Sequence, residues 1–247
     1  MQVEVFSDVV CPWCYIGKRR LEEALGNFAH ADDVTITYRS FQLDPTTPVD
    51  VPGPSAQRLA DKYGVSLAEA EAMGDRVTAV AADAGLEFHT DISQPTNTFD
   101  AHRLLHFAAE HGKQAELKER LLAAYFCRGE HVGHVDSLVA IAAEVGLDPA
   151  EARAVLNSDR YADEVREDFS LARAFGVNSV PFFVIDRKYG IAGAQEAATL
   201  EQALENAWME SHPLTMVGAQ QSGTAPADAG RADTDAAGSC EDGVCRV

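Results

Sequence analysis

Hydrophobic and polar residues alternate in two short segments near the start of the chain. In residues 2–10, valines alternate with polar residues and then continue into Phe6, Val9 and Val10, a pattern that predicts a buried strand. Residues 34–39 alternate in the same way and predict a second strand. Between them, apolar residues recur at helical spacing, at Ile16, Leu21, Leu25 and Phe28. Strand, helix and strand in so short a stretch predict a βαβ unit with a right-handed crossover, which we assign to residues 1–54.

The following stretch, residues 55–157, has a helical pattern throughout. A segment with four prolines and a glycine, residues 45–54, separates it from the first unit. Ser66 and Glu69 have the form of a capping box, and an Asp-Pro-Ala-Glu run at residues 148–151 predicts the start of a further helix. Because no strand pattern interrupts these residues, we expect an inserted helical subdomain.

Residues 158–211 return to an α/β pattern. A helix precedes an apolar run at residues 180–185, a turn follows, and residues 189–192 form a short partner strand, so these segments predict a hairpin. A last helix completes this unit. The remaining residues, 212–247, have no aromatic side chain and are rich in Gly, Ala, Ser, Thr, Asp and Gln, which predicts a flexible tail.

Composition narrows the class of protein. Of 247 residues, 46% are hydrophobic and 24% are charged, as in a typical globular protein, and no apolar run is long enough for a membrane span. The formal net charge of -19 disfavours nucleic acid and anionic lipid as partners. Since the first residues lack a basic segment followed by an apolar core, we expect a cytoplasmic protein. Five cysteines are too few for a disulfide-rich secreted scaffold and favour redox or metal chemistry.

Two of the cysteines form the motif Cys11-Pro12-Trp13-Cys14 at the junction of the first strand and helix. Cys11 falls at the predicted helix N-cap, where free N–H groups and the helix dipole stabilise a thiolate. Pro12 suits the first turn, where its missing N–H costs nothing. Cys14 lies one turn further on, so we expect an exposed, acidic Cys11 that attacks a disulfide and a shielded Cys14 that resolves the mixed disulfide. The alternative is a structural disulfide or an idle pair of core cysteines.

Pro181 interrupts an otherwise strong strand pattern. Proline removes a ladder hydrogen bond, so its presence needs a reason, and a cis bond between Val180 and Pro181 supplies one. Such a bond would leave the Val180 backbone free to pair with an extended peptide lying over Cys11. The alternative is an edge-strand proline in the trans form.

Together these features resemble the thioredoxin fold of DsbA-type proteins. The shared order is strand, CPWC, helix and strand, then a helical insertion, then a helix and a hairpin that opens with Val-Pro. Four further runs are similar to the cytosolic FrnE-like branch of that family: FQLDP at 41–45, NTFDAHR at 97–103, GVNSVP at 176–181 and IAGAQ at 191–195. This branch is related to 2-hydroxychromene-2-carboxylate isomerases and kappa-class glutathione transferases. The resemblance implies an α/β thioredoxin fold with a helical insertion and a flexible C-terminal tail.

The resemblance also implies thiol–disulfide oxidoreductase activity, as a reductase or isomerase of protein or peptide disulfides. Cys11 would be the nucleophile, Cys14 the resolving thiol and Pro181 the cis-proline. The substrate groove would be lined by Pro12, Trp13 and Val180. No resident cofactor is implied, and a dithiol reductant or glutathione would serve as co-substrate. Two alternatives stay open: a glutathione-dependent transferase or isomerase of small aromatic substrates, and a peptide-binding holdase.

A second cysteine pair, Cys240 and Cys245, lies in the tail. The Asp-Gly between them favours a tight turn that brings the two sulfurs within bonding distance. We interpret the pair as an internal redox partner of Cys11 and Cys14; the alternatives are a self-contained disulfide or two idle thiols. A four-sulfur zinc site is disfavoured because the first pair starts a helix in a redox fold, so no metal is expected. The fifth cysteine, Cys127, is interpreted as a buried structural thiol.

Several titratable residues are weaker candidates. Asp8, just before the motif, is either a proton acceptor for the resolving thiol or a simple strand-end acid. His102 and His106 share one helical face and are interpreted as residues of the helix surface. His131 and His134 are spaced like metal ligands, but without an apparent third ligand we interpret them as an exposed loop pair.

Overall fold

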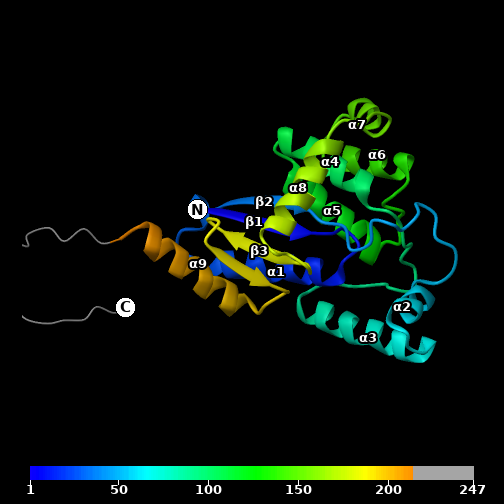
Figure 1. Ribbon diagram of the computed structural model, residues 1–247, viewed down its shortest axis with the longest axis horizontal. Helices are drawn as coiled ribbons and strands as arrows, with labels where there is room; N and C mark the ends of the chain where they lie inside the picture. Colours follow the sequence, from blue (N-terminus) through cyan, green and yellow to red (C-terminus); the bar gives the residue numbers. More distant parts are fainter. Residues whose placement is uncertain (214–247) are drawn as a thin grey trace, which may run out of the picture. The chain divides into compact units, whose positions relative to one another are not determined.

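The computed structural model describes residues 1–213 of the chain (Figure 1). The predicted redox pair of the tail, Cys240 and Cys245, lies outside the described residues. Among the helices of residues 1–213, none combines the length and the apolar character that crossing a bilayer requires.

A mixed sheet forms the middle of the described structure (Figure 1). Its strands in residues 1–213 are β1 (Gln2–Ser7), β2 (Thr35–Ser40), β3 (Phe182–Ile185) and β4 (Tyr189–Ala192). They lie in the order β2-β1-β3-β4, with β1 parallel to β2 and the β3–β4 hairpin antiparallel beside β1. Val3 has Ile36 on one side and Ile185 on the other, so β1 is a central strand. The βαβ unit and the distant hairpin therefore join in one sheet, as the thioredoxin fold requires.

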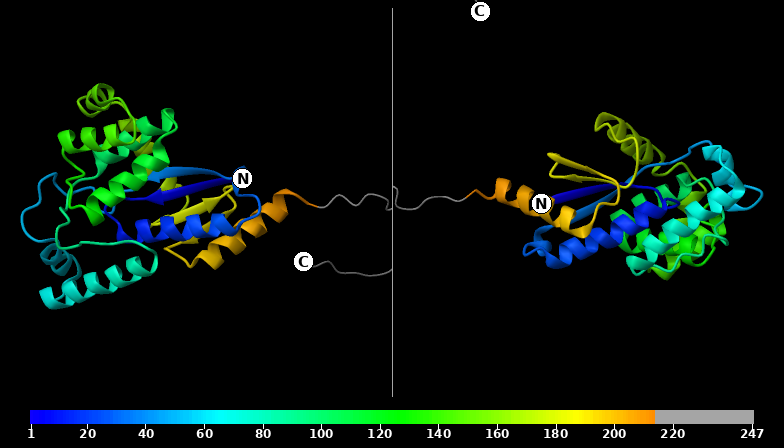
Figure 2. Two further views of the ribbon diagram at one scale, coloured as in Figure 1. Left: turned by 180° about the vertical axis from the view of Figure 1, so that it is seen from behind. Right: turned by 90° about the horizontal axis from the view of Figure 1, so that it is seen from below.

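Helices cover both faces of this sheet, and the alternation along β1 decides which side chains meet them. The covering helices are α1 (Pro12–Asn27), α8 (Ala162–Ala174) and α9 (Ala197–Ser211). α1 and α9 lie side by side on one face and α8 lies on the other (Figure 2). Val3 and Val5 belong to the apolar core beneath α1 and α9, whereas Phe6 belongs to the core that includes Ala172 of α8.

The stretch between β2 and α8 is helical in the described structure. Its helices are α2 (Ser55–Tyr63), α3 (Leu67–Asp83), α4 (Phe99–Glu110), α5 (Gln114–Cys127), α6 (Val135–Glu144) and α7 (Pro149–Leu156). Ser66 and Glu69 form the predicted capping box of α3, and the Asp148 side chain caps α7 as predicted. The largest apolar core lies among these helices and includes Ile16 of α1. The first turns of α1 are thus packed against the helical insertion.

β3 begins at Phe182, so the strand predicted for residues 180–185 starts two residues later than expected. Val180 and Pro181 precede it, and Pro181 therefore removes no ladder bond from β3. α1 approaches this turn closely through Gly17, where an added Cβ would lie 2.9 Å from Pro181 Cγ. The absence of a side chain at Gly17 lets the start of α1 and the turn before β3 meet.

Candidate active site

The CPWC motif starts α1. Cys11 is the N-cap residue with extended backbone, and Pro12 is the first residue of the helix. The N–H of Cys14 donates to the Cys11 carbonyl at 3.1 Å, which closes the first turn. The motif therefore occupies the strand-to-helix junction at which the sequence analysis placed it.

Both cysteines of the motif are buried. Cys11 and Cys14 are each 3% exposed, whereas Trp13 between them is 40% exposed. The expectation of an exposed Cys11 is wrong for this state, because Cys11 packs in an apolar cluster with Phe6 and Val180.

The turn before β3 closes over Cys11. The peptide bond between Val180 and Pro181 is cis, as predicted. The Cys11 thiol donates to the Val180 carbonyl oxygen, 3.5 Å from the sulfur. The sequence analysis expected the Val180 backbone to be free to pair with a peptide. Its carbonyl instead accepts the Cys11 thiol, and becomes free only after Cys11 loses its proton.

A buried polar cluster lies next to the motif and draws on the helical insertion. The Asp8 carboxylate accepts two backbone N–H groups at 2.8 Å each, one of them from Leu43, and lies 3.2 Å from Nε2 of His102 on α4. Lys118 on α5 donates to the Ser7 carbonyl at 3.3 Å. His102 is fully buried, so its expected place on the helix surface is wrong.

The protonation states of this cluster follow from burial and pairing. Burial acts to raise the pKa of Asp8, but the hydrogen bond from His102, the Leu43 N–H and the charge of Lys118 outweigh it, and the pKa of Asp8 is lowered. Burial lowers the pKa of His102. At neutral pH the carboxylate is therefore charged and the imidazole neutral, with its proton on Nε2 toward Asp8. The Nδ1 atom of His102 is buried and has no hydrogen-bond partner within residues 1–213.

The two thiols of the motif ionise as a pair. Burial acts to raise the pKa of Cys14, but the hydrogen bond from Cys11 and the charge of Lys118 outweigh it, and the pKa of Cys14 is lowered. The hydrogen bond with Cys14, followed by burial, raises the pKa of Cys11 well above the ordinary value. When the pair loses one proton, these effects favour the anion on Cys14, whereas the sequence analysis expected it on Cys11. The N-terminus of α1 favours a thiolate at Cys11. Two other contacts oppose it, because the Val180 carbonyl favours the protonated form of Cys11 and the charge of Lys118 favours the anion at Cys14.

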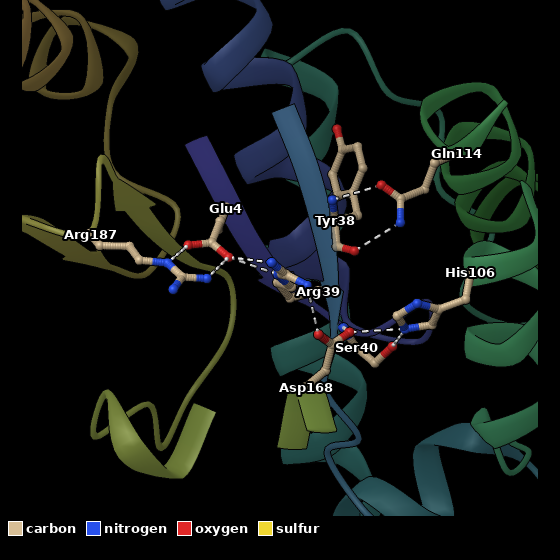
Figure 3. A network of polar contacts seen from close by, with 8 residues as sticks. All are labelled: Glu4, Tyr38, Arg39, Ser40, His106, Gln114, Asp168 and Arg187. Atoms are coloured by element: carbon tan, nitrogen blue, oxygen red, sulfur yellow. Dashed lines mark hydrogen bonds and ion pairs between the residues drawn. The ribbon is translucent and has the colours of Figure 1, made fainter. Parts of the chain in front are cut away.

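A second polar network ties the strands together (Figure 3). Glu4 on β1 accepts hydrogen bonds from Arg39 on β2 at 2.6 and 2.8 Å, and from Arg187 in the β3–β4 turn at 2.9 Å. Arg39 also donates to Asp168 on α8 at 3.2 Å. One buried carboxylate on the central strand thereby joins β2, the hairpin and, through Arg39, the covering helix.

The same figure shows a serine, a histidine and an aspartate close together (Figure 3). Nε2 of His106 lies 3.1 Å from the Ser40 hydroxyl and 3.0 Å from Asp168. A charge-relay triad uses the two different ring nitrogens for its serine and its acid. Because both partners here meet the same nitrogen, we interpret this group as a structural contact.

Gln114 fixes the helix that carries Lys118. Its side chain accepts the N–H of Tyr38 at 2.9 Å and donates to the Tyr38 carbonyl at 3.0 Å (Figure 3). The amide thus pairs with the free edge of β2 as another strand would. Lys118 follows one turn later on α5, so this contact helps to place its ammonium group beside the motif.

The sequence analysis missed Lys118 and Glu4 as site residues. The burial of Lys118 could have been predicted, because Leu121 and Leu122 follow it at the helical spacing of a buried face. The burial of Glu4 could not have been predicted, because a polar residue that alternates with valines predicts an exposed face. Glu4 is buried only because α8 and the arginines cover that face of the sheet.

The other candidates lie in separate surroundings. Cys127 is only partly buried, and burial raises its pKa. Asn97 donates to the carbonyls of Pro45 and Thr47 at 3.3 and 2.8 Å, so it holds the segment between β2 and α2 in place.

Comparison with known proteins agrees with this geometry. The model of the DSBA-like thioredoxin domain matches residues 2–205. A probable DsbA oxidoreductase from Streptomyces coelicolor is 44% identical, with a TM-score of 0.82 over 91% of this chain and 97% of its own. The Bacillus subtilis (strain 168) protein YwbO, described as uncharacterized, is 29% identical over 210 residues, which are 83% of this chain and 96% of YwbO.

A more distant structure has the same fold. The cytosolic disulfide reductase DsbM from Pseudomonas aeruginosa, solved with GSH, is 17% identical, with a TM-score of 0.59 over 86% of this chain and 98% of its own. The family match covers nearly all of the described residues and includes the sheet, α1 and the turn over Cys11. The chain therefore belongs to the family of DSBA-like thioredoxin domains, which are thiol–disulfide oxidoreductases.

Proposed function

We propose that this protein reduces or isomerises protein disulfides in the cytoplasm with Cys11 and Cys14. The observation that carries the proposal is the Cys11 thiol at the start of α1, 3.5 Å from the Val180 carbonyl, with a second thiol of lowered pKa one turn away. Family membership supports redox chemistry in general. The fold shared with cytosolic DsbM supports the location.

The first step uses the shared proton of the pair. In the singly ionised dithiol, the negative charge is favoured on Cys14 and the proton on Cys11. As the Cys11 sulfur attacks a substrate disulfide, its proton passes to Cys14, a bond forms from Cys11 to one substrate sulfur, and the substrate S–S bond breaks. The other substrate sulfur leaves as a thiolate and takes a proton from water. Without its proton Cys11 releases the Val180 carbonyl, which can then accept an N–H of the substrate backbone.

In the second step Cys14 loses the proton that it accepted and acts as the attacking thiolate. Cys14 attacks the Cys11 sulfur of the mixed disulfide, its proton goes to the departing substrate sulfur, and a Cys11–Cys14 disulfide forms. Two electrons have then passed from the dithiol to the substrate. The positive charge of Lys118 favours the anionic form of Cys14 that makes this attack. Lys118 is a positioning residue here, since it acts through Cys14.

The dithiol must be restored by an external reductant. Two glutathione molecules, or one dithiol, reduce the Cys11–Cys14 disulfide and are themselves oxidised. The structure of DsbM with GSH supports glutathione as the first reductant to examine. The cycle requires no resident cofactor.

Insulin reduction by wild type, Cys11→Ser and Cys14→Ser tests the proposal. We expect Cys11→Ser to show only the uncatalysed rate and Cys14→Ser to accumulate a mixed disulfide through Cys11, which mass spectrometry detects. Cys127→Ser is the matched control, because Cys127 lies outside the motif, and it should keep the wild-type rate. A wild-type rate in Cys11→Ser would refute the proposal. Glutathione-dependent turnover of a small aromatic substrate that survives in Cys14→Ser would instead indicate a transferase or isomerase.

The cysteine pair of the tail enters as a further part of this proposal. Cys240 and Cys245 lie outside the described residues, and their spacing in the sequence supports an internal dithiol that exchanges with the motif. We expect the double variant Cys240→Ser, Cys245→Ser to slow dithiol-driven insulin reduction. Unchanged turnover in that variant would remove the tail from the cycle and leave the role of Cys11 intact.

A further inference from the structure

Two histidines and one carboxylate meet outside the redox motif. His131 and His134, between α5 and α6, stack with ring centroids 3.5 Å apart and planes inclined by 12°. Asp50, between β2 and α2, places Oδ1 at 2.7 Å from Nε2 of His134 and 3.9 Å from Nε2 of His131. One ligand atom from each residue lies within 4.8 Å of the others. The sequence analysis interpreted the histidines as an exposed pair because a third ligand was not apparent, and Asp50 supplies that ligand.

We propose that Asp50, His131 and His134 form a binding site for one divalent transition cation of the Zn²⁺ or Co²⁺ type. Imidazole nitrogens suit these ions, and two histidines with one carboxylate leave a fourth position for water. Bonds of about 2 Å to each ligand are compatible with atoms that already lie so close, after side-chain rotation. The Asp50 side chain is 82% exposed and that of His134 is 48% exposed, so both have room to rotate, whereas His131 is only 11% exposed.

Charge and space at the cluster agree with this assignment. Within residues 1–213, Asp50 pairs with these two histidines and with no lysine or arginine. The three residues border a hollow of about 410 Å³ that Ser93 and Gln94 also line, which leaves room for water on the ion.

The hydrogen bond of His131 predicts a local signature of binding. Its Nδ1 accepts the backbone N–H of Gly133 at 3.2 Å, which places the ring proton on Nε2 when no cation is bound. Coordination through Nε2 requires that proton to move to Nδ1, and the Gly133 N–H then loses this acceptor. The amide signal of Gly133 should therefore report occupancy of the site directly.

The position of the cluster suggests what the cation does for the fold. Asp50 belongs to the segment between β2 and α2, which Thr96 and Asn97, just before α4, already hold through the carbonyls of Val49, Pro45 and Thr47. Coordination would also join this segment to the loop before α6. The same segment begins near Leu43, whose N–H binds Asp8 beside the motif.

Titration of the reduced full chain with Co²⁺ tests the site. Thiolate ligands give an intense near-ultraviolet charge-transfer band, whereas two imidazoles and a carboxylate give only weak visible bands, so the cysteines are told apart from this cluster. We expect visible bands that saturate at one Co²⁺ for the cluster and disappear when Zn²⁺ is added. Asp50→Asn and His134→Ala should each weaken this binding roughly tenfold or more. His89→Ala is the control, because within residues 1–213 His89 has one carboxylate, Glu87 at 3.5 Å, and no third ligand.

Two outcomes would overturn the proposal. One is equal Co²⁺ binding by wild type, Asp50→Asn and His134→Ala, all with unchanged thermal unfolding, which would show adventitious binding only. The other is an unmoved Gly133 amide signal in a ¹H–¹⁵N spectrum of the full chain at saturating Zn²⁺. Neither readout depends on disulfide reduction, so the site and the proposed activity stand or fall separately.

Discussion

Replacing Glu4 with glutamine should lower the free energy of unfolding by about 2–4 kcal/mol. Glu4 is 1% exposed and accepts hydrogen bonds of 2.6 to 2.9 Å from Arg39 and Arg187. Removing one partner of a buried ion pair costs about 3–5 kcal/mol, because the other charge stays buried. Two features make the loss of stability smaller here. Arg187 is 55% exposed and can return to water, and Arg39 keeps its ion pair with Asp168 at 3.2 Å. At about 2–4 °C per kcal/mol, Tm should fall by roughly 4–16 °C.

The same carboxylate makes this loss depend on pH. Burial acts to raise the pKa of Glu4, but hydrogen bonds from Arg187 and Arg39 outweigh it and hold the pKa below its ordinary value of 4.5. The unfolded chain therefore binds the proton first as the pH falls. The stabilisation is complete above pH 4.5 and is lost as the pH falls through the lower value of the folded state. Glutamine does not titrate, so the difference between wild type and Glu4→Gln should narrow in acid.

Urea unfolding followed by circular dichroism, from neutral pH to about one pH unit below the ordinary value of 4.5, measures both effects. Glu210→Gln is the matched control, since Glu210 pairs with Lys188 at 3.3 Å and both side chains are more than half exposed. That surface pair should contribute at most about 1 kcal/mol. If Glu4→Gln costs no more than Glu210→Gln, or if the difference is the same at every pH, the buried charge does not hold the strands together as argued.

Two further predictions concern the surroundings of the motif. Lys118→Met removes the positive charge near Cys14, so the pKa of Cys14 should rise and alkylation of the reduced pair at pH 7 should slow severalfold. The control is Lys113→Met, at the exposed start of the same helix, which should leave the alkylation rate unchanged. Equal alkylation rates in wild type and both variants would exclude the effect of Lys118. Gly17→Ala introduces a Cβ only 2.9 Å from its neighbour in the turn over Cys11, which should cost about 1–3 kcal/mol and slow insulin reduction. Gly26→Ala, on the same helix with nothing within 4 Å of its Cβ, should be neutral or slightly stabilising, and similar stability and rates in both alanine variants would contradict the close packing.

The sequence by itself determined the elements and the place of the redox motif. Strand alternation, helical spacing and capping residues such as Ser66 and Asp148 are set by neighbours within a few positions, so the chain's local pattern contains them. For the same reason the start of α1 at Pro12 and the turn at Pro181 were predictable. The family resemblance then supplied the order in which these elements form one sheet.

Only the tertiary structure decided which distant groups share an environment. The charge of Lys118 reaches Cys14 because α5 packs beside α1, and this contact helps to lower the pKa of Cys14. Asp50 meets two histidines from a loop far along the chain, and no periodicity or spacing specifies such an encounter. Burial and long-range electrostatics depend on the packing of whole elements, so they set ionisation and ligand geometry where local sequence patterns carry no information.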